Sequence, residues 1–387
     1  MYIKDLDDKY VAGTYNRFPL ELVSGKGCVL KDVNGKEYID LGSGIGVTAF
    51  GINDGPWTDA VKVQLDKVQH TSNLYYTEPC ARLAEALCEK TGMKKVFFGN
   101  SGAEANECAI KVARKWAAEN KGEEYNVIVT LVNSFHGRTL TTLAATGQEV
   151  FHKYFQPLTP GFAYVEAENV EMLKKVCEEE KVAGILFECI QGEGGVVPLT
   201  ADFIQAIADI CEEKNIIMMV DEVQTGNGRT GMMYSYMNFG LKPDVVSTAK
   251  GLGGGLPIGA CLMSEKVQNV LGPSDHGSTF GGNPVASAGA LSIVNRLDDA
   301  LMAEVKEKSA YIFEEMEGAK GVESVTGLGL MIGIKTEKPV SEVLSKCMEK
   351  GVICLSAKDK VRLLPALNIP MDVLKKAVAV IKEVCAE

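Results

Sequence analysis

The sequence is poor in arginine, histidine and tryptophan, and it lacks long hydrophobic runs. Its 387 residues include seven arginines, four histidines and two tryptophans. Lysine and arginine total 40 against 51 aspartate and glutamate, which gives a net charge of −11. Nucleic acids and anionic membrane surfaces bind clustered positive charge, so we expect neither as a partner. The longest uncharged stretch, 277–295, is rich in Gly, Ser and Asn and does not predict a membrane span.

The cysteines form no recognisable pattern. There are eleven, an odd number, at irregular spacings and without any Cys-x-x-Cys pair. This excludes a regular disulfide framework and a zinc cluster, and we expect no metal site. The first eight residues are acidic and contain no apolar core, so no signal peptide is expected. We therefore expect a cytoplasmic protein with reduced, mostly buried thiols.

The length predicts two or three domains at roughly 150 residues each. In the middle of the chain, apolar runs alternate with amphipathic stretches. Continuous apolar strands separated by helices predict a mostly parallel sheet that is covered on both faces. The expected strands are 96–98, 126–131, 183–187, 216–220, 244–247 and 259–263, and the expected helices between them include 103–120 and 203–214.

The two ends of the chain have a different pattern. Asn34-Gly35 is a hairpin signal inside an apolar stretch. Near the C-terminus we expect one long helix over 284–317, strands at 329–334 and 361–364, and a last helix from Met371. The pattern predicts an α/β protein with a large domain, and a smaller α+β domain built from both ends. We place the large domain at 46–284 and the small one at 1–45 with 285–387.

Three expected strand ends carry polar residues, and ligands bind at such ends in open α/β sheets. The first is followed by Ser101 and, three residues later, Glu104, which is a capping-box spacing. Gly102 and Ala103 would leave the N–H groups of the first helical turn open to a phosphate. A plain capping box without a ligand is the alternative interpretation.

The second strand ends at Asp221. A carboxylate at the end of a buried strand needs a cationic partner, which the protonated ring nitrogen of a cofactor would supply. A structural aspartate that caps the following turn is the alternative. A metal ligand is less expected, because no second His or Asp cluster lies nearby.

The third strand is followed by Lys250 and by four glycines in the next five positions. A lysine whose pKa is lowered is the amine nucleophile of carbonyl chemistry. A surface lysine beside a flexible loop is the alternative, and the sequence lacks the glycine patterns of nucleotide-binding loops. A phosphate loop, then Asp221, then Lys250 29 residues later is the arrangement that pyridoxal 5'-phosphate requires.

Six segments together resemble the class III aminotransferases of the ornithine and acetylornithine type, which have pyridoxal-phosphate fold type I. The resemblance extends from Tyr15 to Pro370. It implies a large domain with a mostly parallel seven-stranded sheet and a smaller α+β domain. The segments are 101–107, 135–139, 191–193, 221–226, 249–251 and 276–284.

The resemblance implies roles for the cofactor site. Lys250 would bond to the cofactor aldehyde and move the proton, and Asp221 would keep the ring nitrogen protonated. Phe135 would stack on the ring, and Gln224 would lie beside the phenolic oxygen. Thr279 would reach the cofactor phosphate of the other subunit, which implies a homodimer with active sites at its interface. The implied cofactor-binding residues are Ser101, Gly102, Ala103, Phe135, Asp221, Val223, Gln224, Lys250 and Thr279.

The resemblance also implies a substrate site. Arg138 would bind the substrate α-carboxylate. Glu193 would pair with Arg362 and move away when a second carboxylate needs that arginine. One pocket must accept an amine-bearing substrate and a dicarboxylate in turn, so an exchangeable pair suits the chemistry. The implied substrate-binding residues are Tyr15, Arg17, Arg138, Glu193, Ser278 and Arg362.

Two local features indicate the substrate. Tyr15-Asn16-Arg17 resembles the entrance segment of acetylornithine-type enzymes, and Ile45 stands where ornithine-type enzymes carry a tyrosine that holds a free α-amino group. The expected reaction is transamination of N2-acetyl-L-ornithine with 2-oxoglutarate, giving N-acetyl-L-glutamate 5-semialdehyde and L-glutamate. The alternatives are 4-aminobutyrate, succinylornithine, N-succinyl-diaminopimelate or ornithine as amino donor, an aminomutase, or a non-catalytic protein of this fold.

The sequence departs from the family pattern at 51–57, Gly-Ile-Asn-Asp-Gly-Pro-Trp. Relatives usually have Gly-His-x-x-Pro here. The departure concerns the local loop and leaves the expected chemistry unchanged.

Overall fold

A computed structural model describes residues 3–387, and its largest element is a seven-stranded sheet. Six strands run parallel and only β12 runs antiparallel, between β11 and β4. This confirms the expected α/β class and the mostly parallel sheet. In spatial order the strands are β4 (Lys95–Gly99), β12 (Gly259–Met263), β11 (Val245–Thr248), β10 (Ile217–Asp221), β7 (Val182–Phe187), β5 (Val127–Leu131) and β6 (Phe162–Val165).

Helices cover both faces of this sheet, which explains its continuous apolar strands. Every residue of β7 and β10 is buried. Ile217 and Met219 of β10 join the apolar cluster that contains α5 (Gly102–Asn120). Met218 and Val220 face the opposite cluster, to which α8 (Val170–Glu179) and α9 (Ala201–Glu213) contribute. Side chains of alternate strand residues therefore pack against different helix layers.

Three smaller sheets complete the fold. One has the order β1-β2-β3-β15, the second β13-β14-β17-β16, and the third pairs β8 with β9. Their bounds are β1 (Leu22–Lys26), β2 (Val29–Asp32), β3 (Glu37–Asp40), β8 (Ile190–Gln191), β9 (Val197–Pro198), β13 (Val322–Leu328), β14 (Met331–Thr336), β15 (Val352–Ile353), β16 (Leu355–Ala357) and β17 (Lys360–Leu363).

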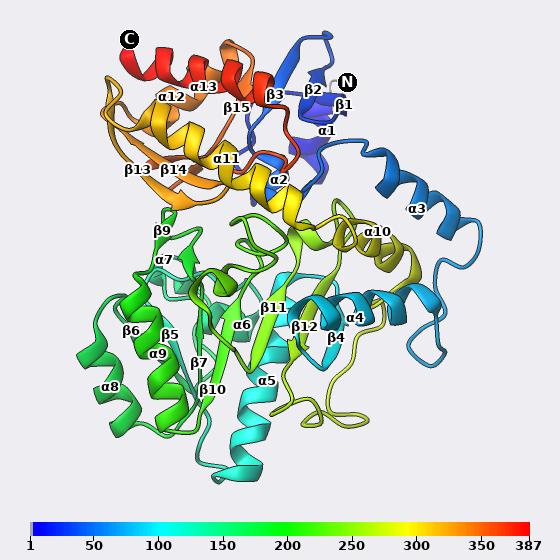
Figure 1. The fold of residues 1–387 in the computed structure, drawn as a ribbon, viewed down its shortest axis with the longest axis vertical. Helices are drawn as coiled ribbons and strands as arrows, with labels where there is room; N and C mark the ends of the chain where they lie inside the picture. Colours follow the sequence, from blue (N-terminus) through cyan, green and yellow to red (C-terminus); the bar gives the residue numbers. More distant parts are fainter. Residues whose placement is uncertain (1–2) are drawn as a thin grey trace.

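The N- and C-terminal segments lie together at one end of the molecule (Figure 1). β15, near the C-terminus, pairs in parallel with β3, near the N-terminus. Helices α11 (Asp299–Met316), α12 (Val340–Glu349) and α13 (Met371–Ala386) pack beside these small sheets. The domain boundaries at 46–284 and 285–387 remain a prediction.

The expected single helix over 284–317 is wrong, because the structure has two. Helix α10 (Pro284–Val294) ends before Asn295, and α11 begins after Asp298. The carboxylate of Asp298 accepts a hydrogen bond from the backbone N–H of Leu301 at 2.9 Å, so this residue caps a new helix. Helix α10 packs on α3 (Gly55–Leu65) and α4 (Glu78–Thr91), whereas α11 packs on α13.

The remaining helices are short. They are α1 (Ile3–Tyr10), α2 (Ser43–Gly46), α6 (Leu140–Ala145), α7 (Glu149–His152), and the 3-10 turns η1 (Ser235–Phe239) and η2 (Lys250–Leu252). Within residues 3–387, no helix combines the length and apolarity that crossing a bilayer requires.

Candidate active site

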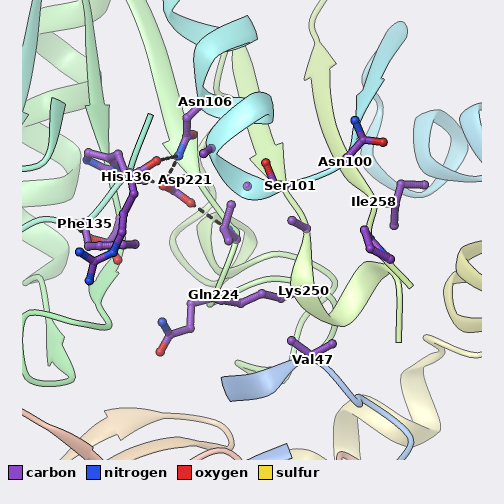
Figure 2. A pocket seen from close by; sticks show the side chains of 18 of the residues that line it. Val47, Asn100, Ser101, Asn106, Phe135, His136, Asp221, Gln224, Lys250 and Ile258 are labelled. Atoms are coloured by element: carbon purple, nitrogen blue, oxygen red, sulfur yellow. Dashed lines mark hydrogen bonds and ion pairs between the residues drawn. The ribbon is translucent and has the colours of Figure 1, made fainter. Parts of the chain in front are cut away.

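A cavity of about 470 Å³ opens at the carboxyl ends of β4, β10 and β11. Its wall is formed by the start of α5, the loop after β5, the ends of β7 and β10, and the segment around Lys250 (Figure 2). Parallel strands bring their carboxyl ends to one edge of a sheet, so residues distant in the sequence meet here. Of the residues expected to bind the cofactor, all except Thr279 line this cavity.

The start of α5 has the geometry of an anion site. Ser101 is the N-cap residue, and its hydroxyl accepts a hydrogen bond from the backbone N–H of Glu104 at 3.2 Å. The carboxylate of Glu104 turns back to the N–H of Asn100, one residue earlier than a capping box requires. A Cβ on Gly102 would lie 2.7 Å from Val223, so only glycine allows this close approach. The N–H groups of the first turn thus face the cavity, where a phosphate would bind.

Asp221 lies at the end of β10 with a nearly inaccessible carboxylate. One oxygen, Oδ2, is 2.8 Å from Nδ2 of Asn106 and 2.8 Å from Nδ1 of His136. The other oxygen, Oδ1, accepts from the backbone N–H of Val223 at 2.9 Å. These contacts fix the direction of the carboxylate at the cavity wall. The Nε2 atom of His136 is buried and lacks a hydrogen-bond partner in the described chain.

Lys250 presents an amine that is free to react. Within residues 3–387 its Nζ atom makes no hydrogen bond or ion pair. Burial lowers the pKa of this amine, and Arg362 adds to the effect, while the carboxylates of Glu193 and Asp221 oppose it. The backbone at Lys250 has a φ of +44°, a left-handed conformation that L-residues rarely adopt. Such strain is maintained only by surrounding structure and is common at functional sites.

These features fit pyridoxal 5'-phosphate. The chain supplies open N–H groups for a phosphate, a buried carboxylate for a ring nitrogen, and an amine of lowered pKa for an aldehyde. Gly102 and Val223 both line the cavity, and a side chain at position 102 would collide with Val223. Ser101 to Ala103 would hold the phosphate, Asp221 the ring nitrogen, and Lys250 the aldehyde carbon.

Arg138 lies at the edge of the cavity over two aromatic rings. Its guanidinium carbon is 5.6 Å from the centre of the Phe135 ring and 4.4 Å from that of Phe151. The two rings meet edge to face at 5.7 Å. Arg138 has no carboxylate partner among residues 3–387. Aromatic contacts orient the guanidinium without neutralising it, so the charge stays available to an incoming carboxylate.

Glu193 and Arg362 form an ion pair beside Lys250. Nη1 of Arg362 donates to Oε1 of Glu193 at 2.6 Å and to Oε1 of Gln224 at 3.0 Å. Gln224 in turn donates from Nε2 to Glu193 at 3.2 Å. Burial would raise the pKa of Glu193, but the charge and hydrogen bond of Arg362 lower it overall. The carboxylate is therefore ionised at neutral pH and neutralises the buried arginine.

Sequence reasoning missed three residues of the site. His136 and Asn106 both contact the carboxylate of Asp221, and Glu188 follows β7 with an exposed fraction of only 5%. Glu188 accepts hydrogen bonds from the N–H groups of Phe135 at 3.1 Å and Gly192 at 3.2 Å. Burial raises its pKa to about 7, and the charge of Asp221 adds to this effect. A carboxylate directly after a buried strand was the available signal, the same one that Asp221 carries.

Six expected residues lie outside the cavity lining. Two of them, Glu193 and Arg362, contact Gln224, which lines the cavity. Tyr15 is exposed, and Arg17 lies over its ring at 5.7 Å and pairs with Asp7 at 3.2 Å. Thr279 is exposed on the loop before α10. The hydroxyl of Ser278 accepts from Nδ2 of Asn100, a residue that does line the cavity, at 3.1 Å.

The fold and the cavity define an enzyme of the pyridoxal-phosphate type, and comparison with known proteins identifies its family. The sequence pattern described as aminotransferase class-III matches residues 10–385. The chain is 47% identical to an acetylornithine aminotransferase of Haemophilus ducreyi, over 100% of this chain and 98% of that protein. It is 42% identical to an acetylornithine aminotransferase of Methanocaldococcus jannaschii, over 99% and 98% of the two chains.

Solved structures agree with this assignment. The ornithine aminotransferase of Toxoplasma gondii superposes with a TM-score of 0.95 at 29% identity, over 99% of this chain and 94% of that one. The N-acetylornithine aminotransferase of Stenotrophomonas maltophilia has a TM-score of 0.85 at 31% identity, over 99% and 98%. The chain belongs to the class III aminotransferases. This family uses pyridoxal 5'-phosphate, and a second Toxoplasma gondii structure is described with that cofactor at its active site.

Proposed function

We propose that this enzyme transfers the terminal amino group of N2-acetyl-L-ornithine to 2-oxoglutarate. The products are N-acetyl-L-glutamate 5-semialdehyde and L-glutamate. The observation that carries the proposal is that the site has two arginines in different states, one without a carboxylate partner among residues 3–387 and one neutralised by a glutamate. Arg138 has no carboxylate partner in the described chain, whereas Arg362 is neutralised by Glu193. The acetylornithine aminotransferases named above, at 47% and 42% identity, support the same substrate.

Lys250 and Asp221 carry the chemistry. When bound, pyridoxal phosphate supplies an aldehyde that bonds to amines and a ring that withdraws electrons from the neighbouring carbon. Asp221, whose carboxylate is buried at the end of β10, would hold the ring nitrogen and favour its protonated form. Lys250, whose pKa is lowered by burial, would be the base that moves the proton at the amine-bearing carbon of the substrate.

The two arginines bind the two substrates differently. In acetylornithine the reacting amine is terminal, so the α-carboxylate lies at the far end, against Arg138. 2-Oxoglutarate reacts at its α-carbon, so its α-carboxylate must approach the cofactor and bind Arg362. Glu193 neutralises Arg362 in the first case and moves away in the second, which avoids an unpaired buried charge.

Ile45 supports an acylated amino donor. It lies on α2, where its backbone φ is +65°, and its side chain is 42% exposed. An isoleucine cannot accept a hydrogen bond from a free α-amino group, so the site favours a nitrogen whose charge is removed by acylation. The same side chain would accept 4-aminobutyrate, which is the main competing substrate.

We further infer that the enzyme is a homodimer with shared active sites. Several large apolar side chains are exposed in the single chain: Leu74 at 86%, Tyr75 at 71%, Tyr76 at 107% and Phe280 at 60%. Such a concentration is typical of protein interfaces. Thr279 lies next to Phe280 and would reach the partner's cofactor phosphate. The cytoplasm is the proposed compartment, since all eleven cysteines are unpaired and nine are buried.

Side-by-side kcat/KM values test the substrate assignment. The amino donors to compare are acetylornithine, ornithine, 4-aminobutyrate, succinylornithine and N-succinyl-diaminopimelate, each with 2-oxoglutarate. Acetylornithine should give the highest value. A higher value for 4-aminobutyrate or ornithine would replace the proposed substrate and leave the reaction type intact.

Lys250→Ala tests whether the protein is an enzyme at all. The variant should retain cofactor through its phosphate but lose the absorbance band of the lysine-bound cofactor and turn over many orders of magnitude more slowly. Near-normal turnover by this variant would refute the proposed chemistry. A wild-type protein that binds cofactor without transaminating any of these donors would be the non-catalytic alternative.

A further inference from the structure

Trp57 contacts the glycine-rich loop that follows Lys250. Its indole Nε1 donates a hydrogen bond to the backbone oxygen of Gly253 at 3.0 Å. A Cβ on Gly254 would lie 3.0 Å from the same nitrogen, and one on Gly255 would lie 3.9 Å from the indole ring. The glycines therefore allow the loop backbone to lie directly against the indole. Gly255 also lines the cofactor cavity.

The loop in turn determines the backbone at Lys250. The N–H of Gly253 donates to the backbone oxygen of Lys250 at 3.0 Å, which closes the short turn η2. On the other flank, Nδ2 of Asn227 donates to the oxygen of Ala249 at 3.2 Å. The left-handed conformation at Lys250 costs free energy and needs support from its neighbours. Asn227 supplies one support and Trp57 the other.

Trp57 itself is firmly held. It lies in the first turn of α3, where its backbone N–H donates to the carboxylate of the N-cap residue Asp54 at 3.2 Å. Both oxygens of Asp54 accept from the guanidinium of Arg296, at 3.1 Å and 2.6 Å. That guanidinium lies 3.9 Å from the centre of the Phe50 ring. The segment 51–57, which departs from the family pattern, is thus an ordered anchor.

We propose that Trp57 is a positioning residue for Lys250: through Gly253 it holds the strained turn that presents the amine to the cavity. The inference concerns the residues of this chain and rests on the proposed role of Lys250 in bonding the cofactor. It does not depend on which amino donor is the substrate. Trp57 lies outside the cavity lining and is expected to touch neither cofactor nor substrate.

Stopped-flow absorbance of the full-length enzyme, freed of cofactor and mixed with pyridoxal 5'-phosphate, tests the proposal. Saturation kinetics separate the initial complex, which depends on Ser101 to Ala103, from the first-order step in which Lys250 forms its bond. In Trp57→Phe the first-order rate should fall about fivefold, as expected for one lost hydrogen bond. The apparent affinity of the initial complex should stay unchanged. Loss of a purely structural residue would instead lower thermal stability, without slowing the first-order step selectively.

Trp116→Phe is the matched control. Trp116, the second of the two tryptophans, is buried on α5 within the apolar cluster that covers the sheet, and its substitution should leave both kinetic constants at wild-type values. Equal first-order rates in Trp57→Phe and wild type would overturn the inference. Absence of the absorbance band in wild type as well would instead overturn the proposed role of Lys250, and the inference with it.

Gly289→Ala provides a second variant if Trp57→Phe does not fold. Gly289 lies in α10, where alanine is intrinsically the better helix former. A Cβ there would lie 2.8 Å from Nε1 of Trp57 and must displace the indole. The same selective loss in first-order rate is expected, without loss of helix stability. A wild-type rate in Gly289→Ala would show that the position of Trp57 does not matter.

Discussion

Arg362 is bound to Glu193 through only one of its nitrogens. Nη1 lies 2.6 Å from Oε1 of Glu193. The other two nitrogens, Nε and Nη2, have no hydrogen-bond partner in residues 3–387, and Nε is buried. A guanidinium binds a carboxylate best through two parallel hydrogen bonds. Arg362 therefore has donors left for a stronger, bidentate interaction with a substrate carboxylate. We therefore expect that a substrate carboxylate can replace Glu193 at this arginine.

Arg362→Ala should harm one half-reaction much more than the other. The reaction with glutamate or 2-oxoglutarate loses its charge-assisted pair, which costs about 2–5 kcal/mol, or roughly 30-fold to several thousand-fold in kcat/KM. The acetylornithine half should change little, because Arg362 binds no carboxylate there. Single-turnover spectroscopy of each half-reaction measures both.

Arg138→Ala is the matched comparison, since it should slow both half-reactions. Arg138, which lies over Phe135 and Phe151, is the residue proposed to bind the far carboxylate of either substrate. Equal losses in both halves for Arg362→Ala would show that no exchange takes place at Glu193.

Glu193→Ala should reduce selectivity for the terminal amine. Without Glu193, Arg362 is free to bind the α-carboxylate of ordinary α-amino acids such as ornithine. The ratio of kcat/KM for acetylornithine to that for ornithine reacting at its α-amine should fall, with product analysis showing which amine reacted. The ratio for Glu193→Gln should lie between those of wild type and Glu193→Ala, because glutamine keeps the side-chain volume but not the charge. An unchanged ratio in both variants would refute a gating role.

Asp221→Asn should reduce kcat by at least about a hundredfold, the range expected when a charged partner of a buried pair is lost. An amide cannot hold the proton on the cofactor ring nitrogen. The fold should survive, because the amide oxygen of the substituted side chain would still accept from the N–H of Val223, as Asp221 does at 2.9 Å. Thermal unfolding and kcat measured on the same preparation separate the two effects. A wild-type kcat would identify Asp221 as structural.

Because of Glu188, the cofactor-free enzyme should lose stability as pH rises from about 4.5 to about 7. Its pKa is raised by burial from 4.5 to about 7, so the folded state holds this proton more tightly than the unfolded chain. The contribution is complete below about pH 4.5 and is lost as pH rises to about 7, with an upper limit of about 3 kcal/mol. Glu188→Gln mimics the protonated form. Its stability relative to wild type should therefore rise between pH 5 and pH 8 in urea unfolding.

An exposed glutamate provides the control for this titration. Glu149→Gln, on the surface helix α7, should show no such change with pH. If Glu188→Gln tracks Glu149→Gln across the range, Glu188 is ionised throughout and its burial does not control the titration.

The strands and the three strand-end groups were predictable because they depend on local pattern. A run of apolar residues ending in Asp221 predicts a buried strand, and Ser101 followed by glycine predicts a helix start. Neither prediction requires knowledge of the tertiary packing. The helix break at Asn295–Asp298 was missed because a capping aspartate and a charged helical residue look alike in sequence.

Only the tertiary structure decided which residues meet. The contacts of Asp221 with Asn106 and His136 span 115 and 85 residues of sequence, and the contact of Trp57 with Gly253 spans 196. No periodicity encodes such sequence separations. The first two contacts form at the sheet edge where parallel strands end. The third forms where α3 meets the loop after Lys250. The lowered pKa of Lys250 and the raised pKa of Glu188 likewise come from burial, which exists only after folding. The chain by itself determined which chemical groups are available, and packing decided their charge, direction and partners.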